Sequence, residues 1–342
     1  MNNLLRHAAI PLETLAYGPA YSWLKFNIRS PEPLDEQAAW NFITGEIPPA
    51  ADWVRRSYPP KFLRSALIAN KMRQAHAKGI AEHYDVSNAF YELFLDKKFM
   101  FYTCADFPTG NETIEEAQTI KADFLLALID PKPGERILEL GCGWGAMLKH
   151  IYSTTGDKEN LYGFTLSHEQ VAHNASVNGF NVEYRDFINT DYPPEYYDKI
   201  YSIGAWEHVR PKEVLPLMRK LYGALKPGGR LVQHFFCRVE RPIPATAITG
   251  QIFFPGSLNA PYVDHVRWNE AAGFRIRQRT IHDYRPTLRA WFDNLVANRD
   301  EAIRLVGVET YNRYVLFFPS AYRYFQDGVG MLIRWVMEKP ST

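Results

Sequence analysis

A glycine-rich turn is the first pattern in this sequence that could do chemistry. It has the form Glu139-x-Gly141-x-Gly143-x-Gly145 and directly follows an apolar run. Glycines let the backbone turn tightly into a helix and approach a bound nucleotide closely. An acidic residue before the first glycine favours a site for S-adenosylmethionine. The spacing Gly141-x-Gly143-x-x-Ala146 also satisfies a loose dinucleotide pattern, so a dehydrogenase is the alternative.

Two later runs predict where the rest of such a ligand would lie. In dinucleotide-binding folds the second strand usually ends in an acidic residue that holds the ribose hydroxyls. Here hydroxyl and amide groups follow that strand, on Thr165, Ser167 and Gln170. Asp186 and Phe187 close the third strand, where a carboxylate can accept the adenine amino group and a ring can stack on the base. Phe187 could equally be an ordinary core residue.

These side chains need a scaffold of alternating strands and helices. Apolar runs predict strands at 135–141, 160–166, 181–187, 197–204 and 230–236. Helical patterns lie between them, at 145–154, 167–178 and 211–225. Regular alternation implies an α/β fold with parallel strands and helices on both faces of the sheet. Ligands of such sheets bind at the carboxyl ends of the strands.

Composition excludes several classes of protein. The 342 residues are 46% hydrophobic and 14% aromatic, which is enough apolar material for a full core and argues against disorder. The three cysteines, Cys104, Cys142 and Cys237, are far apart, so neither a disulfide framework nor a zinc site is predicted. No apolar run is long enough for a membrane span or a signal peptide, so we expect a cytoplasmic protein in a reducing compartment.

The charge is close to balanced overall but uneven along the chain. A net charge of +1 argues against a protein that coats nucleic acid. Residues 53–80 nevertheless hold seven Lys or Arg and no acidic residue, which leaves −6 for the rest of the chain. The spacing of apolar residues there predicts a basic amphipathic helix. It is either a solvated helix packed on the main domain or a contact with an anionic membrane surface.

Four blocks of sequence carry a resemblance to a known family. They are HYDVSNAFYELFLD (83–96), FMFYTCADFPTGNETIEEAQ (99–118), ILELGCGWG (137–145) with GFTLSHEQ (163–170), and YSIGAWEHVRP (201–211) with LVQHFF (231–236). In these blocks the chain resembles the cyclopropane-fatty-acyl-phospholipid synthases and mycolic acid cyclopropane synthases.

The resemblance implies a Rossmann-like, seven-stranded class I methyltransferase fold with a smaller, mainly helical N-terminal region. The domains expected are 1–82, which contains the basic segment 53–80, and 83–342, which contains a substrate lid at about 237–267.

The resemblance also implies a reaction. Enzymes of this family add a methyl group from S-adenosylmethionine to the cis double bond of an acyl chain, and the resulting cation loses a proton and closes a cyclopropane ring. Such a reaction needs precise alignment, a dry aromatic cavity and a base for a carbon-bound proton. A side-chain carboxylate could trap the cation as an ester, and the family uses a bound bicarbonate ion as the base.

The family's site residues have matches in this chain. The resemblance assigns bicarbonate to Cys104, Glu207, His234, Tyr284 and the backbone N–H of Phe236. In that set His and Tyr donate to the anion, while Glu207 accepts its hydroxyl proton and holds the imidazole. The donor is assigned to Tyr102 and Thr103 at its methionine end, to Glu139, Gly141, Gly143 and Gly145, to Thr165, Ser167 and Gln170 at the ribose, and to Asp186 and Phe187 at the adenine. No metal is expected, and we expect His83 and His208 to be structural.

Three departures from the family pattern limit the substrate assignment. Ala89 stands where relatives commonly have an acidic residue, and the lid reads FFPGSLNAPY (253–262). No cysteine follows Cys237, which excludes the C-terminal thiol once suspected as a nucleophile. The acceptor is therefore the least determined feature.

Two alternatives stay open. The first is a methyltransferase of the same family that makes a methyl-branched lipid or methylates carbon, or less readily nitrogen, of a small natural product. The lid favours it, whereas Tyr284 disfavours the nitrogen version. The second is a lipid-surface or scaffold protein with a degenerate domain, which intact glycines disfavour. The expected partners are an unsaturated lipid or another apolar acceptor, an anionic membrane at its inner face and a second copy in a homodimer, but no nucleic acid.

Overall fold

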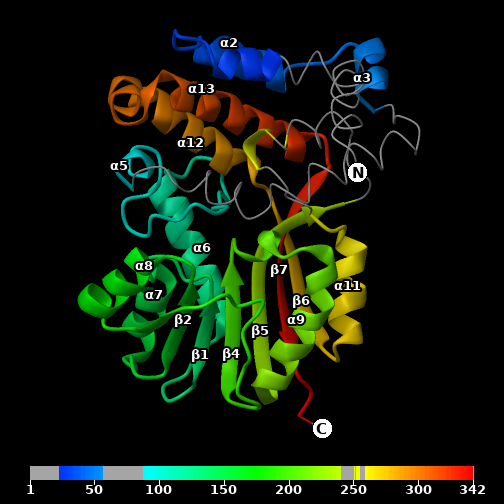
Figure 1. Cartoon of the computed structure of the whole chain (residues 1–342). Helices are drawn as coiled ribbons and strands as arrows, with labels where there is room; N and C mark the ends of the chain where they lie inside the picture. Colours follow the sequence, from blue (N-terminus) through cyan, green and yellow to red (C-terminus); the bar gives the residue numbers. More distant parts are fainter. Residues whose placement is uncertain (1–22, 57–87, 240–249, 251, 255–258, 342) are drawn as a thin grey trace, which may run out of the picture. The chain divides into compact units, whose positions relative to one another are not determined.

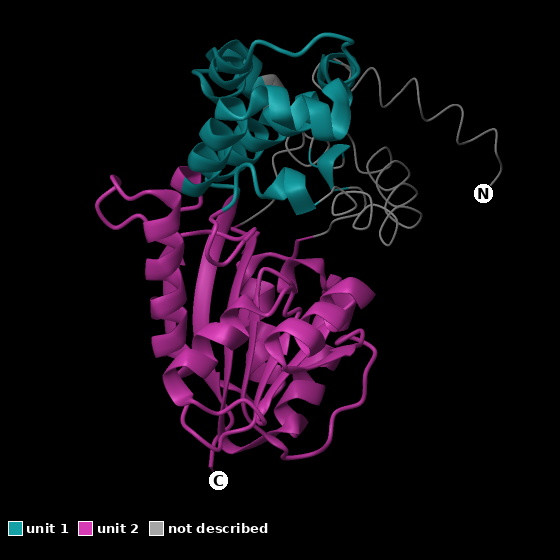
Figure 2. Cartoon of the chain, turned by 90° about the vertical axis from the view of Figure 1, so that its left-hand side faces the viewer, with its two compact units in different colours: residues 1–95, 241–257, 287–329 teal, residues 96–240, 258–286, 330–342 magenta. Residues whose placement is uncertain are grey.

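The computed structural model describes residues 23–56, 88–239, 250, 252–254 and 259–341. The chain forms two compact units, which Figure 2 shows in different colours. Unit 1 comprises 1–95, 241–257 and 287–329, and unit 2 comprises 96–240, 258–286 and 330–342. The expected boundary at 82/83, most of the basic segment and part of the lid lie outside the described residues, so these stay predictions.

Unit 2 is built on a seven-stranded sheet (Figure 1). Its strands are β1 (Ile137–Leu140), β2 (Leu161–Thr165), β3 (Asn181–Tyr184), β4 (Tyr197–Ile203), β5 (Leu225–Arg238), β6 (Arg275–His282) and β7 (Gly330–Glu338). They lie in the order β3-β2-β1-β4-β5-β7-β6. The first five pair in parallel, and β7 runs antiparallel to both β5 and β6. The predicted fold class is thereby confirmed.

Helices cover both faces of this sheet. They are α6 (Ile114–Ile129), α7 (Ala146–Thr155), α8 (His168–His173), α9 (Pro211–Ala224) and α11 (Tyr262–Ala271). Side chains of β5 alternate between two cores: Val232 packs in the core that includes residues of α6 and α7, while Leu231 packs in the core that includes residues of α9. This period of two places every second side chain of a strand on the same face.

The predicted elements are confirmed with shifts of up to five residues at their ends, the largest at the start of β5, and they differ in kind in one place. The helix expected over 167–178 ends as a regular α-helix at His173, and residues Asn174–Asn178 form a π-helical turn. Ser167 caps α8, accepting a hydrogen bond at its side chain from the Gln170 N–H. Such π turns insert a residue into a helix and are common at functional sites.

Unit 1 is helical where it is described. Its helices are α2 (Glu36–Thr44), α3 (Pro49–Arg56), α5 (Asn88–Tyr91), most of α12 (Arg285–Ala297) and α13 (Arg299–Gln326). Trp40 of α2 packs against the rings of Phe292 and Tyr322, with centroids 4.6 and 5.1 Å away. Across the described part of the chain, no helix is long and apolar enough to cross a membrane.

Candidate functional site

The glycine turn after β1 has a backbone that only glycine adopts readily. Gly141, Gly143 and Gly145 have φ angles of +78°, +53° and +78°. A Cβ on Gly141 would lie 2.6 Å from the Cβ of Ala205, and one on Gly145 would lie 2.0 Å from Oδ1 of Asn174. A Cβ on Gly143 would have no described atom within 4 Å. The turn is therefore packed at its two ends and open in the middle, where a ligand can approach the backbone.

The π turn holds this glycine turn in place. Asn174 donates its amide N–H to the carbonyl of Gly143 at 3.0 Å, and Asn178 donates to the carbonyl of Trp144 at 3.0 Å. Asn178 also donates to Oδ1 of Asn174 at 3.0 Å. Sequence reasoning missed both residues, because helical periodicity gives no sign of one inserted residue.

The acidic residue of the turn is buried. Glu139 accepts a hydrogen bond from the hydroxyl of Tyr201 at 2.8 Å. Burial raises the pKa of Glu139 to about 8, although the Tyr201 hydrogen bond and the charge of Lys121 lower it. Glu139 is thus a buried polar group directly before the turn, where the sequence predicted a cofactor contact.

The residues predicted at the methionine end of the donor lie near the carboxyl end of β4. A Cβ on Gly204, the residue after β4, would lie 2.2 Å from Cγ2 of Thr103, so this loop packs on the end of the strand. Lys121 of α6 is fully buried and donates to Oγ1 of Thr103 at 2.7 Å. Tyr102, the preceding residue, is half-buried. The ammonium of Lys121 lies 3.5 Å from the centroid of the Phe101 ring.

The residues predicted for ribose and adenine follow β2 and β3. Thr165 donates its hydroxyl to the side-chain oxygen of Gln170 at 2.5 Å, so the structure brings these two together with Ser167 at the start of α8. Asp186 accepts hydrogen bonds from the N–H of Ile188 and from the amide of Asn189. Phe187 packs at the edge of the core that contains Leu138 and is only partly buried.

Glu207 lies in a short 3-10 helix, Trp206–His208, directly after β4. It accepts a backbone hydrogen bond from the Phe236 N–H, and burial raises its pKa to about 8. Although part of the residue reaches solvent, its Oε2 atom is buried and has no hydrogen-bond partner among the described residues. In this structure the Phe236 N–H therefore donates to Glu207, whereas the resemblance assigned that N–H to the bicarbonate ion.

His234 lies on β5, opposite Ile203 of β4 and Arg334 of β7. Its Nδ1 accepts a hydrogen bond from Nε of Arg334 at 2.9 Å, and its buried Nε2 has no partner within the described part of the chain. Burial lowers its pKa well below the usual range, with further lowering by the charges of Arg334 and Lys121. The guanidinium of Arg334 therefore holds this imidazole, whereas the resemblance had implied that Glu207 would do so.

Cys104 and the backbone next to Tyr284 are far apart in the sequence but lie close together in unit 2. The Cys104 thiol is fully buried and donates to the carbonyl of Asp283 at 3.6 Å. Tyr284, the next residue, is half-buried at the end of the β6 segment. The structure thus brings Cys104 next to the Tyr284 backbone. It also brings Glu207 to Phe236, which is two residues after His234 on β5.

Four buried or half-buried ionisable groups around this site were not predicted: Asp106, Lys121, His282 and Arg334. For two of them, Lys121 and Arg334, the sequence does contain an indication of burial. Lys121 occupies the buried position of a stripe with Ala117 and Leu125 at helical spacing, and Arg334 interrupts the apolar strand 330–337. Charges at core positions are rare unless they are paired or functional.

The residues present fit the groups that the resemblance implies. An open glycine turn after β1 with a buried acid fits a nucleotide-like donor. A protonated carboxyl and an imidazole N–H, both buried and unpartnered in the described structure, fit a small oxyanion. No group of three or more His, Cys, Asp or Glu in the described ranges could hold a metal ion.

Comparison with known proteins gives the same family. Residues 71–335 match the family described as mycolic acid cyclopropane synthetase. The S-adenosylmethionine-dependent methyltransferase UmaA of Mycobacterium tuberculosis is 30% identical over 275 residues, which cover 75% of this chain and 95% of that protein. The cyclopropane synthase MmaA2 from Mycobacterium tuberculosis superposes with a TM-score of 0.71 at 26% identity, covering 77% of this chain and 98% of that one.

A solved structure with ligands supports the cofactor. The mycolic acid cyclopropane synthase CmaA1, complexed with SAH and CTAB, has a TM-score of 0.69 and 27% identity and covers 77% of this chain and 98% of its own. SAH is the demethylated form of S-adenosylmethionine. The chain belongs to the mycolic acid cyclopropane synthetase family and is an S-adenosylmethionine-dependent methyltransferase.

Proposed function

We propose that this methyltransferase converts the cis double bond of an unsaturated acyl chain, carried by a phospholipid, into a cyclopropane ring. The observation that carries the proposal is a pair of buried polar atoms without described partners, Oε2 of Glu207 and Nε2 of His234. Glu207 follows β4, and His234 lies on the adjacent strand β5 opposite the last residue of β4, at the ligand-binding edge of the sheet. An unpartnered buried donor is costly, so its presence favours a ligand that satisfies it.

The proposed ligand at these atoms is bicarbonate. It would supply a base for a carbon-bound proton and avoid a side-chain carboxylate next to a cation. His234 donates its N–H there, and Glu207, protonated near neutral pH by its raised pKa, can donate as well as accept. The positive charge of Arg334 lowers the pKa of His234 and favours an anion at the same place. Cys104 and Tyr284 are proposed to complete the set.

S-adenosylmethionine would be held along the same edge of the sheet and supplies the methyl group. The space next to Gly143, where a Cβ would meet no described atom within 4 Å, supports contact between the glycine turn and the donor. Thr165, Ser167 and Gln170 are proposed to bind the ribose, and Asp186 to accept from the adenine amino group. Tyr102 and Thr103 are proposed to position the methionine end.

The decisive experiment is a lipid assay with a methyl-labelled donor. Purified full-length protein is incubated with vesicles of a cis-unsaturated phospholipid, and the extracted lipid is analysed by mass and proton NMR. We expect a product heavier by one methylene unit with the separate signals of a cyclopropane ring, and no product from saturated vesicles. Absence of labelled lipid would overturn the proposal. A labelled product with branch-methyl signals and no ring would instead support the C-methyltransferase alternative.

The role of bicarbonate is tested separately. In buffer freed of carbon dioxide under argon, we expect the rate to fall and to recover when bicarbonate is added. Chloride at the same ionic strength is the matched control. An unchanged rate without bicarbonate would remove the anion from the proposal and leave the transferase activity standing.

We infer that the enzyme reaches a lipid substrate by a transient electrostatic contact. The charge of +7 over residues 53–80 supports this, since an anionic surface attracts basic segments at low salt. Replacing Arg64, Lys71 and Lys78 by Gln should weaken sedimentation with anionic vesicles and remove its salt dependence. Unchanged binding at low salt would contradict this inference.

A further inference from the structure

A chain of polar contacts in unit 2 runs from Thr280 to His234. The hydroxyl of Thr280 lies 2.8 Å from Nε2 of His282, whose Nδ1 lies 2.9 Å from Oδ1 of Asp106. Both carboxylate oxygens of Asp106 accept from Arg334, at 2.5 and 2.9 Å. Arg334 then donates its Nε–H to Nδ1 of His234.

The register of three strands places this chain on one face of the sheet. Arg334 of β7 is opposite His234 of β5 on one side and opposite Thr280 of β6 on the other. Side chains opposite each other in antiparallel strands share a face. Asp106 reaches them from the loop before α6, and its own N–H is tied to the carbonyl of Ala117 at 3.1 Å.

Arg334 is fully buried, so removing its charge from water costs free energy. Its guanidinium forms a two-pronged contact with Asp106 and lies 5.1 Å from the centroid of the Phe124 ring. Although burial alone would raise it, the hydrogen bonds from His282 and Arg334 hold the pKa of Asp106 below its ordinary value. A buried ion pair often contributes little net stability compared with apolar packing, so stability alone does not explain it.

The contact with His234 determines which nitrogen carries the proton. An arginine has five N–H donors and no acceptor, so Nδ1 of His234 must be the unprotonated nitrogen. The proton of the neutral ring then lies on Nε2, the buried atom without a described partner. A charged imidazolium would place an N–H against the Nε–H of Arg334, so the same contact disfavours protonation.

We propose that Arg334, held in place by Asp106 and His282, is a positioning residue that fixes His234 as the neutral tautomer with its proton on Nε2. The ion pair with Asp106 needs only the two terminal nitrogens of the guanidinium. The third nitrogen, Nε, is thereby free of the carboxylate and donates to His234. The catalytic consequence rests on the proposed function, whereas the tautomer itself does not.

The experiment measures the tautomer and the rate on the same proteins. Full-length protein labelled with ¹⁵N-histidine is studied by long-range proton–nitrogen NMR, and the His234 signals are assigned by their loss in His234→Gln. We expect wild type to show only the form protonated on Nε2. Arg334→Met should show both tautomers. With S-adenosylmethionine saturating, kcat should fall roughly tenfold to a hundredfold, by analogy with the removal of a group that orients a metal-binding histidine.

Three further variants make the test specific. Arg334→Lys keeps a group that can only donate and should restore the single tautomer. Arg230→Met removes another arginine of the same sheet, which donates to the carbonyl of Leu128 at 2.9 Å, and should change neither the tautomer nor kcat. Asp106→Asn keeps the side-chain shape and serves if Arg334→Met fails to fold; it should give the same mixture to a smaller extent.

The outcomes separate the two proposals. A folded Arg334→Met protein that binds SAH with wild-type affinity, keeps the single Nε2–H form and keeps its kcat would overturn the positioning role. Unchanged His234 signals in Asp106→Asn would overturn it as well. If wild type makes no cyclopropane lipid but the tautomer shifts in Arg334→Met, the proposed function fails and the positioning role stands.

Discussion

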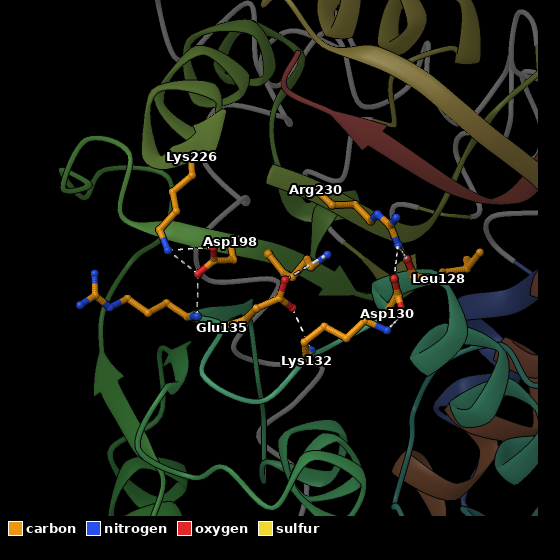
Figure 3. A network of polar contacts seen from close by, with 9 residues as sticks. Leu128, Asp130, Lys132, Glu135, Asp198, Lys226 and Arg230 are labelled. Atoms are coloured by element: carbon orange, nitrogen blue, oxygen red, sulfur yellow. Dashed lines mark hydrogen bonds and ion pairs between the residues drawn. The ribbon is translucent and has the colours of Figure 1, made fainter. Parts of the chain in front are cut away.

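The two edges of the sheet in unit 2 differ in whether their polar and charged side chains have hydrogen-bond partners. At the amino ends of β1, β4 and β5, charged side chains are paired with one another, as Figure 3 shows. Asp198 accepts from Lys226 at 2.7 Å and from the N–H of Arg136 at 2.9 Å, and Glu135 accepts from the N–H of Lys132 at 2.8 Å. At the carboxyl ends, Glu207 and His234 each keep a buried atom without a described partner.

The difference supports the proposal that the carboxyl edge binds the ligand. The amino edge satisfies its charges internally and partly in solvent, which is what stability alone requires. At the carboxyl edge each unsatisfied buried group costs about 1–3 kcal/mol, and a chain retains such groups where binding or chemistry repays them. Substitutions that should act at one edge and not at the other test this difference.

The largest expected effect is on the reaction. His234→Ala should lower the rate of methyl transfer about 10²-fold or more, because it removes a hydrogen-bond donor to the proposed bicarbonate base. The measurement is the initial rate with labelled donor at saturating lipid. Asp198→Asn, at the amino edge, should keep a rate close to that of wild type. Equal losses in the two variants would remove the distinction between the edges.

The second effect concerns pH and stability. The pKa of Glu207 is raised to about 8 in the folded protein, so on unfolding near neutral pH the carboxyl loses its proton. Below the ordinary pKa both states are protonated and nothing is lost. As pH rises from about 5 to about 8, wild type should lose stability relative to Glu207→Gln, by an amount on the order of a few kcal/mol.

Urea unfolding of both proteins at pH 5, 6.5 and 8.5, in buffer without bicarbonate, measures this difference. The titration of His234 occurs in both proteins and cancels in the comparison. A difference in unfolding free energy that stays constant with pH would contradict a buried, protonated Glu207. It would also make the carboxyl edge resemble the amino edge.

How far the sequence predicted this site depends on what fixes each residue. The glycines directly follow an apolar run, and parallel strands bring their carboxyl ends to one edge, so periodicity was sufficient for them. Glu207 and His234 were assigned through the resemblance of their sequence blocks to the family. Arg334 meets His234 across 100 residues and Asp106 across 228, through the register of an antiparallel strand. Hydrophobic patterns do not specify that pairing, and the contacts were therefore not predictable.

The π turn shows the same limit on a smaller scale. Helical spacing correctly predicted that residues near 167–178 wind into a helix. One inserted residue rotates Asn174 and Asn178 toward the glycine turn, and that rotation depends on their bonds to the carbonyls of Gly143 and Trp144. Local propensity predicted the helix correctly. It did not predict which way Asn174 and Asn178 point, because their contacts with the glycine turn decide that.

The third effect compares two glycines in similar backbone conformations. Gly143 at the carboxyl edge and Gly134 before β1 have φ angles of +53° and +83°, and a Cβ on either meets no described atom within 4 Å. Alanine at each position should cost about 1–2 kcal/mol of stability for the left-handed backbone. Only Gly143→Ala should weaken S-adenosylmethionine binding, by about tenfold or 1.4 kcal/mol. Calorimetric titration measures this, and equal affinities in both variants would mean that the donor does not approach Gly143.

The smallest effect tests whether the amino edge is a set of separate solvated pairs. Lys132 and Asp130 form an ion pair at 2.5 Å, with side chains 62% and 45% exposed. The hydrogen bond from Lys132 lowers the pKa of Asp130, but water screens the pair and ordering two exposed side chains costs entropy. Lys132→Gln should therefore change the free energy of unfolding by less than about 0.5 kcal/mol. A loss above about 1.5 kcal/mol would mean that Asp130, Arg230 and Glu135 act as one coupled network, in which each charge depends on its neighbours as it does around Arg334.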